Sequence, residues 1–300
     1  MGYHICRKAA ISNAQGDIIG RQRLFEYVNG LRGIDLSLYR RATVARKLDL
    51  RLDETATRSY TEYLGYLKSH PGEIDNLIKA LTIKVSNFFR NPLVFELLHS
   101  RVLPALLSEF GALRIWSIGC ATGEEPYSVA IILKELLSKE RAAVHADILG
   151  TDIDAEAIRK AVAGEYPDEE LQEVKKRHLD AFFHEIPATA QHHVGQKRRY
   201  GINDEIKSMV RFEPGDIVAT FRQHEGAKRS FHVILCRNVL IYMNRALQQK
   251  IFGCIADIMV PNGYCIIGES ETIPETSRNT FVQVFPGVKI YRKTAGTERR

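Results

Sequence analysis

RIWSIGCATGEEPYS, residues 114–128, is the stretch that decides the fold of this 300-residue chain. An apolar run at 115–118 leads into two glycines, Gly119 and Gly123, and an apolar-periodic segment follows at 127–137. This order predicts a buried strand, a tight turn and the start of a helix. Such a turn lets a ligand approach bare backbone at the carboxyl end of a strand, where open α/β sheets bind their ligands.

Two acids, Glu124 and Glu125, distinguish this turn from a dinucleotide-binding loop. The spacing is not G-x-G-x-x-G, and the carboxylates stand where a pyrophosphate would lie. Two negative charges disfavour phosphate and suit a hydroxyl-rich or cationic ligand, and S-adenosylmethionine (SAM) is both. The alternative is a plain strand-turn-helix, in which the acids serve only the helix dipole and Pro126 is an ordinary first-turn proline.

Size and composition indicate a soluble globular protein with room for two domains. No apolar run approaches the ~20 residues of a membrane span, and the N-terminus lacks an apolar signal core, so we expect a cytoplasmic protein. The five cysteines are scattered and argue against a disulfide framework. The histidines form no metal-binding cluster, so we expect no metal. The net charge of +6 suggests an acidic partner surface rather than nucleic acid.

Residues 20–110 are predicted to be helical, with helices at 39–52, 57–69, 72–83 and 93–109. In the first of these, apolar residues fall on one face at helical spacing: Leu38, Ala42, Ala45, Leu48 and Leu52. Three basic residues, Arg40, Lys47 and Arg51, fall on the opposite face. The pattern predicts a small α domain followed by a linker helix.

From Arg114 onward, predicted strands and helices alternate. The strands are expected at 114–118, 146–151, 231–236, 263–268 and 287–292. The helices are expected at 124–139, 154–163 and 244–260. This alternation predicts an α/β domain with a Rossmann-like, doubly wound parallel sheet. The strongly charged interval at about 165–212 interrupts the rhythm, and we expect it to be an inserted subdomain with short antiparallel strands.

Polar residues stand at the predicted carboxyl ends of the strands. Asp152 follows one strand, where an acid commonly binds a ribose hydroxyl pair, while Asp154 can cap the next helix. Asp216 follows the short run at 210–214 and can reach an adenine amino group or form a bland surface turn. Arg237 and Asn238 follow the strand 231–236, where polar groups need a partner or a ligand.

Four segments, in this order and spacing, resemble the chemotaxis receptor methyltransferases, the CheR-type family. They are SNFFRNP (86–92), WSIGCATGEEPYS (116–128), LGTDID (149–154) and CRNVLIYM (236–243). GIDLSLYRRATVARKL (33–48) also resembles the family's helical domain. The resemblance covers about residues 25–292. It implies an enzyme that transfers a methyl group from SAM to glutamate side chains of chemoreceptors, with S-adenosylhomocysteine (SAH) as the product.

The resemblance also implies roles for single residues. The expected cofactor-binding residues are Lys84, Ser86, Arg90, Gly119, Glu124, Asp152, Asp216, Ile217, Arg237 and Asn238. Arg90 and Tyr242 are the expected catalytic residues, at the active-site entrance and near the transferred methyl group. Three positions depart from the family, the mildest being Cys120 in the glycine turn, where relatives often carry a small residue. Lys84 replaces a smaller or amide residue, and the PGDI segment around Asp216 replaces an asparagine-leucine pair, which weakens the adenine assignment.

In family terms we expect a flexible N-terminus at 1–20, a helical receptor-docking domain at 21–92, a linker helix at 93–113 and a methyltransferase domain at 114–293. Arg40, Lys47 and Arg51 are expected to dock acidic cytoplasmic helices of the receptor. The enzyme is expected to be a monomer without an integral membrane segment. Two alternatives remain open: a SAM-dependent methyltransferase for another acceptor, and a non-catalytic SAM-binding scaffold.

Overall fold

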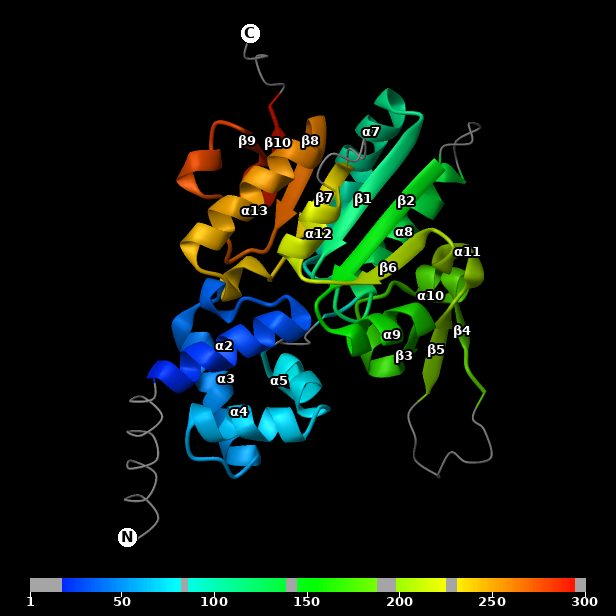
Figure 1. The fold of residues 1–300 in the computed structure, drawn as a ribbon. Helices are drawn as coiled ribbons and strands as arrows, with labels where there is room; N and C mark the ends of the chain where they lie inside the picture. Colours follow the sequence, from blue (N-terminus) through cyan, green and yellow to red (C-terminus); the bar gives the residue numbers. More distant parts are fainter. Residues whose placement is uncertain (1–17, 82–85, 139–144, 188–197, 225–230, 295–300) are drawn as a thin grey trace, which may run out of the picture. The chain divides into compact units, whose positions relative to one another are not determined.

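A computed structural model describes residues 18–81, 86–138, 145–187, 198–224 and 231–294. The chain divides into two compact units. The helical unit comprises the residues up to Ile83 together with Tyr242–Gln248, and the sheet unit comprises Lys84–Ile241 and the residues from Gln249 onward (Figure 1). The N-terminus predicted to be flexible falls almost wholly outside the described residues.

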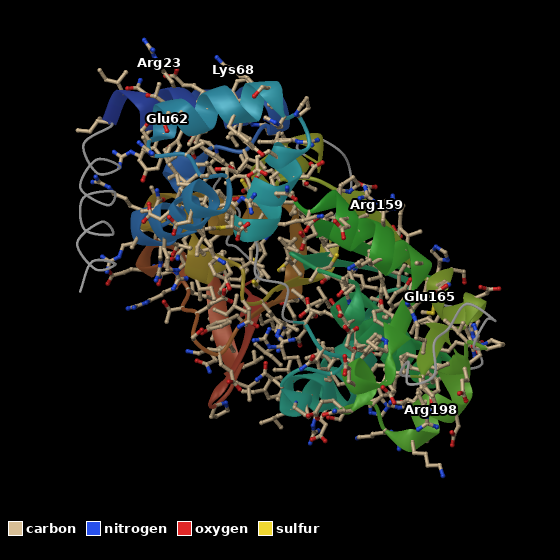
Figure 2. The ribbon with its side chains drawn as sticks, turned by 90° about the horizontal axis from the view of Figure 1, so that it is seen from below. Arg23, Glu62, Lys68, Arg159, Glu165 and Arg198 are labelled. Carbon is tan, nitrogen blue, oxygen red and sulfur yellow. The ribbon has the colours of Figure 1, made fainter. Side chains whose placement is uncertain are left out.

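The helical unit is built from α2 (Ile18–Arg32), η1 (Leu36–Leu38), α3 (Arg41–Glu54), α4 (Tyr60–Ser69) and α5 (Glu73–Leu81). Ser59 caps α4 through its side-chain oxygen, which accepts from the Glu62 amide. Exposed charged side chains of α2 and α4, among them Arg23, Glu62 and Lys68, point outward (Figure 2). All the helices predicted here are present, with boundaries shifted by a few residues.

The helix predicted at 39–52 differs from the observed structure at its start. Asp35 caps the short helix η1, and α3 begins only at Arg41. The buried side chains of α3 are Val44, Leu48 and Leu52, whereas Ala42 is exposed. The apolar stripe is therefore rotated from the predicted one, because Val44 offers more apolar surface than the alanines.

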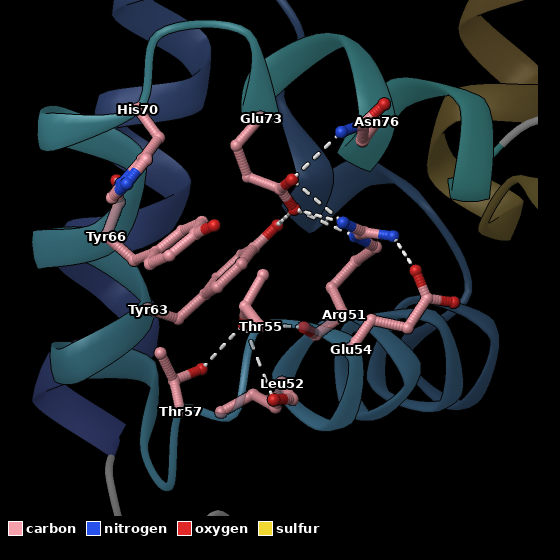
Figure 3. Close-up of polar contacts among 10 residues, drawn as sticks. All are labelled: Arg51, Leu52, Glu54, Thr55, Thr57, Tyr63, Tyr66, His70, Glu73 and Asn76. Atoms are coloured by element: carbon pink, nitrogen blue, oxygen red, sulfur yellow. Dashed lines mark hydrogen bonds and ion pairs between the residues drawn. The ribbon is translucent and has the colours of Figure 1, made fainter.

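A buried polar cluster joins α3, α4 and α5 (Figure 3). The Arg51 guanidinium donates to both carboxylate oxygens of Glu73 at 2.8 Å, and the Tyr63 hydroxyl donates to Glu73 Oε1 at 2.8 Å. Arg51 also pairs with Glu54, and Asn76 donates to Glu73. Although burial acts to raise it, these hydrogen bonds lower the pKa of Glu73. The carboxylate therefore stays ionised and holds three helices together.

The sheet unit contains a seven-stranded sheet in the order β6-β2-β1-β7-β8-β10-β9. Its strands are β1 (Ala112–Ile118), β2 (His145–Asp152), β6 (Val210–Pro214), β7 (Phe231–Cys236), β8 (Met259–Ile267), β9 (Phe281–Phe285) and β10 (Val288–Lys293). The first five are parallel, and β10 runs antiparallel to β8 and β9. The sheet is thus mixed, which corrects the prediction of a parallel sheet at its last two strands.

Helices cover both faces of this sheet, as the doubly wound prediction requires. The connection from β1 to β2 and on towards β6 uses α8 (Glu124–Leu137) and α9 (Ala155–Ala163). The connections from β6 to β7 and β8 use α12 (Ile217–His224) and α13 (Arg245–Ile258) on the other face (Figure 1). This arrangement follows from the right-handed rule for parallel connections. The predicted helix at 93–109 is a continuous run of α6 (Pro92–Leu97), the π turn η2 (Leu98–Val102) and α7 (Leu103–Glu109).

The inserted interval forms a second, three-stranded antiparallel sheet, as predicted. Its strands are β3 (Glu165–Pro167), β4 (Phe183–Glu185) and β5 (Arg199–Ile202), in the order β3-β5-β4. They lie alongside η3 (Asp168–Leu171), α10 (Lys176–Phe182) and α11 (Asp204–Lys207). Tyr166 and Phe183 from this sheet belong to the same buried core as the main sheet. The insertion is therefore packed into the sheet unit.

The glycine turn between β1 and α8 uses backbone conformations that few residues adopt. Gly119, Ala121 and Gly123 all have positive φ, at 70°, 48° and 96°. A Cβ atom on Gly119 would also overlap the side chain of Val239. Glycine at position 119 is therefore required both by its φ and by the close approach of the loop after β7.

Replacing Glu73 tests the buried cluster. Glu73→Gln leaves the Arg51 guanidinium buried without its carboxylate, and we expect the free energy of unfolding to fall by about 3 kcal/mol. Glu54→Gln is the matched control, because that partner is 62% exposed and should change stability by less than about 1 kcal/mol. Urea unfolding measures both. Equal effects would contradict the central role of Glu73.

Replacing Gly119 tests the turn. We expect Gly119→Ala to destabilise the sheet unit by about 2 kcal/mol or more, because alanine disfavours φ of +70° and its methyl group overlaps Val239. Gly253→Ala in α13 is the control, since outside the helix's own backbone no atom lies within 4 Å of its new methyl group, and helix propensity favours alanine by about 1 kcal/mol. Urea unfolding measures the change. If Gly119→Ala were as stable as the parent protein, glycine would not be required at this position.

Candidate functional site

The candidate site lies at the carboxyl ends of β1, β2 and β7, where the predicted polar residues come together. Asp152 links the first two of these ends. Its Oδ2 accepts from the Ala121 amide in the glycine turn at 2.9 Å, and its Oδ1 accepts from the Asp154 amide at 2.9 Å. Asp154 itself caps α9, as predicted. Asp152 thus fixes the turn through both of its carboxylate oxygens.

Glu124 is the more deeply buried of the two acids after the turn. Its side chain accepts hydrogen bonds from Thr122, at 2.6 Å, and from Ser86. The second oxygen, Oε2, is buried and has no hydrogen-bond partner among the described residues. Burial raises the pKa of Glu124, and the two hydroxyl donors oppose that effect. A buried carboxylate oxygen without a partner is costly, so this position favours a ligand that brings a donor.

Glu125 differs from Glu124, because both of its carboxylate oxygens are bound by protein groups. Its Oε2 pairs with Arg237 Nη1 at 2.9 Å, and its Oε1 accepts from Ser117 at 2.7 Å. Arg237 Nη2 donates to the Arg90 carbonyl at 2.7 Å and to Asn91 Oδ1 at 2.5 Å. The Arg237 side chain is only 3% exposed. Protein groups pair both terminal nitrogens of this guanidinium, whereas Nε is buried without a hydrogen-bond partner among the described residues, and a contact with the cofactor stays a prediction.

The segment from Ser86 to Asn91 is held by aromatic packing. The Phe88 ring lies edge-on to Tyr166 at 4.8 Å and to Phe183 at 5.4 Å between centroids. The Tyr166 hydroxyl in turn donates to the Thr122 carbonyl at 2.7 Å, in the glycine turn. The inserted sheet therefore supports both segments that border the candidate site.

The neighbouring Phe89 is held just as firmly. Its amide donates to the Ser128 hydroxyl at 2.9 Å, and its ring centroid lies 5.3 Å from that of the buried His178 on α10. Phe89 has a φ of 53°, which is unusual for a bulky residue. These contacts fix the backbone immediately before Arg90, whose own side chain is partly exposed.

Asp216 caps α12, with Oδ1 accepting from the amides of Val218 and Ala219 at 2.8 and 3.3 Å. The following residue, Ile217, is buried. The short run before Asp216 is strand β6, the outermost parallel strand, so Asp216 stands at the same edge of the sheet as Asp152. The turn is therefore structured as a helix cap, and a contact with adenine stays a prediction.

Glu271 is a residue that the sequence reasoning missed. It is 3% exposed, follows β8, and accepts hydrogen bonds from four backbone amides, three of them in the loop that carries Asn238. The signal that could have found it is the segment GESE directly after an apolar strand. An acid at a strand's carboxyl end has the same placement as Asp152.

The remaining predicted residues lie in the helical unit or outside the described residues. Tyr242 ends η4 (Leu240–Tyr242), and its carbonyl accepts from the Arg40 amide at 2.8 Å. Arg40 is exposed and Lys47 is partly exposed. Arg51 is not on a solvated face, because its side chain is 11% exposed and bound to Glu73, which corrects its assignment to docking. Lys84 lies outside the described residues.

Within the described residues, no cluster of three or more His, Cys, Asp or Glu side chains has the arrangement of a metal site. The same part of the chain contains no helix long and apolar enough to span a bilayer. The donors and acceptors gathered at the strand ends are instead carboxylates, hydroxyls and backbone amides. These groups fit SAM. Glu124 Oε2 needs a hydrogen-bond donor, and the carboxylates at the strand ends favour a cationic ligand.

Comparison with known proteins identifies the family of this chain. The model of the CheR methyltransferase SAM binding domain matches residues 84–288, and that of the CheR methyltransferase all-alpha domain matches residues 20–82. The chain is 31% identical to the chemotaxis protein methyltransferase of Listeria innocua over 242 residues, covering 80% of this chain and 85% of the relative. It is also 31% identical to that of Escherichia coli K12 over 261 residues, covering 86% and 85%. The chain therefore belongs to the CheR methyltransferase family of SAM-dependent enzymes.

Proposed function

We propose that this enzyme transfers a methyl group from SAM to glutamate side-chain carboxylates of chemoreceptors, forming methyl esters and SAH. The observation that carries the proposal is the Glu124 oxygen, buried without a described partner beside a glycine turn at the carboxyl end of β1. The relatives' name, chemotaxis protein methyltransferase, supports the substrate class. No observation favours a different acceptor or a non-catalytic scaffold.

Each cofactor contact is proposed from the position of its residue. Glu124 and Asp152 accept from hydroxyl or amino groups of SAM, because both carboxylates stand at the carboxyl ends of strands. Asn238, which follows β7 with a φ of 61°, lines the pocket. Asp216 and Ile217 flank the adenine. Ser86 acts through its hydrogen bond to Glu124. The Gly119 backbone allows the close approach of the ligand.

Methyl transfer to a glutamate carboxylate needs no acid or base catalysis from the protein. A glutamate substrate is already ionised near neutral pH, since its unperturbed pKa is about 4.3, so methyl transfer requires no general base. SAM supplies an electrophilic methyl group on its sulfonium. The protein aligns the carboxylate oxygen with that methyl group and excludes water, a contribution on the order of 7–11 kcal/mol in favourable cases. Arg90 would orient the substrate carboxylate through charge-assisted hydrogen bonds, and Tyr242 would serve as the second catalytic residue through its ring or hydroxyl toward the methyl donor.

The acceptor is tested with methyl-labelled SAM and the cytoplasmic fragment of a chemoreceptor from the source organism. We expect label on the receptor fragment that base treatment releases as methanol, because glutamyl methyl esters hydrolyse in base and N-methyl groups do not. Base-stable label would show a different acceptor. SAM binding without turnover would favour the scaffold alternative.

The same assay tests Arg90. We expect Arg90→Ala to lower kcat on the receptor fragment by about 100-fold, because a misplaced nucleophile loses its alignment. Arg101→Ala, which removes an exposed arginine from η2 in the same unit, is the control and should keep full activity. Normal methylation by Arg90→Ala, with normal SAM affinity, would remove Arg90 from the mechanism.

Receptor docking is tested on the exposed basic residues of the helical unit. We expect the double variant Arg40→Glu, Lys47→Glu to raise KM for the receptor fragment about tenfold at low salt, with the effect shrinking as salt screens the charges. SAH affinity, measured by calorimetry, should not change. Arg58→Glu, an exposed charge reversal elsewhere in the same unit, is the control. Equal loss of receptor methylation and SAH binding would indicate misfolding rather than docking.

A further inference from the structure

Glu271 binds an unusual number of backbone amides for a single buried carboxylate. Its Oε2 accepts from the amides of Gly268 at 2.6 Å and Asn238 at 3.0 Å. Its Oε1 accepts from the amides of Leu240 at 2.8 Å and Ile241 at 3.3 Å. An ionised carboxylate accepts about four such bonds, whereas a protonated one must also find an acceptor. The four backbone amides therefore favour the ionised form of Glu271.

Three of the four amides belong to the loop that follows β7. The loop begins at Asn238, whose φ of 61° lies in the left-handed region. The residue before it, Arg237, is held separately by Glu125 and Asn91. Glu271 thus determines where the chain goes after Arg237, and with it the position of Asn238.

Gly268 brings Glu271 and Asn238 into one packed group. A Cβ atom on Gly268 would lie 2.8 Å from Glu271 Oε2, 2.9 Å from the Asn238 amide nitrogen and 3.0 Å from Asn238 Nδ2. The side-chain amide of Asn238 therefore packs against the bare Gly268 backbone. Its place depends on both residue 268 and the carboxylate of residue 271.

This arrangement is costly for the fold. Burial raises the pKa of Glu271, and the bonds from the Gly268, Asn238, Leu240 and Ile241 amides only oppose that effect. In the described part of the chain, no lysine or arginine pairs with it. A desolvated charge without a cation is expensive, and apolar packing could hold a surface loop at lower cost. Local costs of this kind are characteristic of functional sites.

We propose that Glu271 is a positioning residue for the methyl-transfer reaction, which sets the Asn238 backbone and aims its side-chain amide at the cofactor. The inference rests on the proposed function in one respect, the placement of Asn238 in the SAM pocket. Glu271 touches neither SAM nor substrate in this scheme. It acts through the loop that it holds.

The test replaces Glu271 with glutamine, which keeps its volume. Glutamine keeps one acceptor oxygen, but its NH2 group faces two of the four backbone amides as a donor, so the loop that carries Asn238 loses its fixed position. We expect Glu271→Gln to raise KM for SAM and the Kd for SAH about tenfold, the effect of losing roughly one good hydrogen bond, with kcat at saturating SAM within about twofold. The exposed neighbour Glu269→Gln is the matched control and should leave all three constants unchanged.

The pattern of constants separates positioning from general stability. A merely structural role would reduce the fraction of folded enzyme, which lowers apparent kcat and leaves KM for SAM and the Kd for SAH unchanged. That result, or wild-type constants in Glu271→Gln, would overturn the inference. SAH calorimetry needs no receptor, so it still decides the matter if the wild-type enzyme methylates no receptor fragment and the proposed function fails.

A second variant covers the case in which Glu271→Gln does not fold. Gly268→Ala keeps the Glu271 side chain and places a methyl group against its Oε2 and both nitrogens of Asn238. We expect it to weaken SAH binding about tenfold through the same displaced side chain. Gly253→Ala, with open space around its Cβ, is the control. Unchanged SAH affinity in Gly268→Ala would show that the position of Asn238 does not matter for the cofactor, and the inference would fall.

Discussion

The buried ion pair between Glu125 and Arg237 is the interaction on which the site depends. It joins the first turn of α8 to the end of β7, and the other guanidinium nitrogen reaches the Arg90 carbonyl and Asn91. Three segments far apart in sequence are thereby tied by one side chain. A pair this buried contributes little net stability against well-packed apolar residues, but loss of either partner leaves an uncompensated charge. The ion pair therefore matters for geometry, because it fixes the positions of these three segments at the site.

The two neighbouring glutamates show how one helix start serves both structure and chemistry. Glu125 is consumed by Arg237 and Ser117, whereas Glu124 keeps a buried oxygen without a described partner. Helical geometry explains the division, since successive side chains point about 100° apart. The helix dipole stabilises both negative charges at this end. Glu125 therefore serves the fold, while one oxygen of Glu124 is left for a ligand.

Much of the fold could be predicted from local pattern, because its central strands are long apolar runs between clear breaks. The boundaries predicted for β7 match the observed ones, and α8 begins at Glu124 as expected. Strand β9 was missed because it is an edge strand with exposed positions, and α12 because it has only eight residues. The antiparallel orientation of β10 also escaped prediction, because β9 was not recognised as a strand, so Pro286 and Gly287 were not read as the turn of a hairpin.

The site was predicted less completely, and the reason lies in partners rather than in residue types. Arg51 and Arg237 were predicted to be binding residues because the sequence does not show which carboxylate pairs with a given arginine. Glu73 and Glu125 compensate them from 22 and 112 positions away. Glu271 was overlooked for the opposite reason, because backbone amides, its partners, are present at almost every residue and cannot mark a site in a sequence.

The acids at the strand ends explain why this site favours a cationic ligand. The protein carries a net charge of +6, yet Glu124, Asp152 and Glu271 all stand at the carboxyl ends of strands in one sheet. Arg237, the nearby cation, is neutralised by Glu125. The anionic character of this edge is therefore local and opposes the charge of the whole molecule. Such a field attracts a sulfonium and repels a phosphate, and in a low-dielectric setting it acts more strongly than it would in water. The internal pairing of the arginine and the acids gathered at this edge together favour a cationic cofactor.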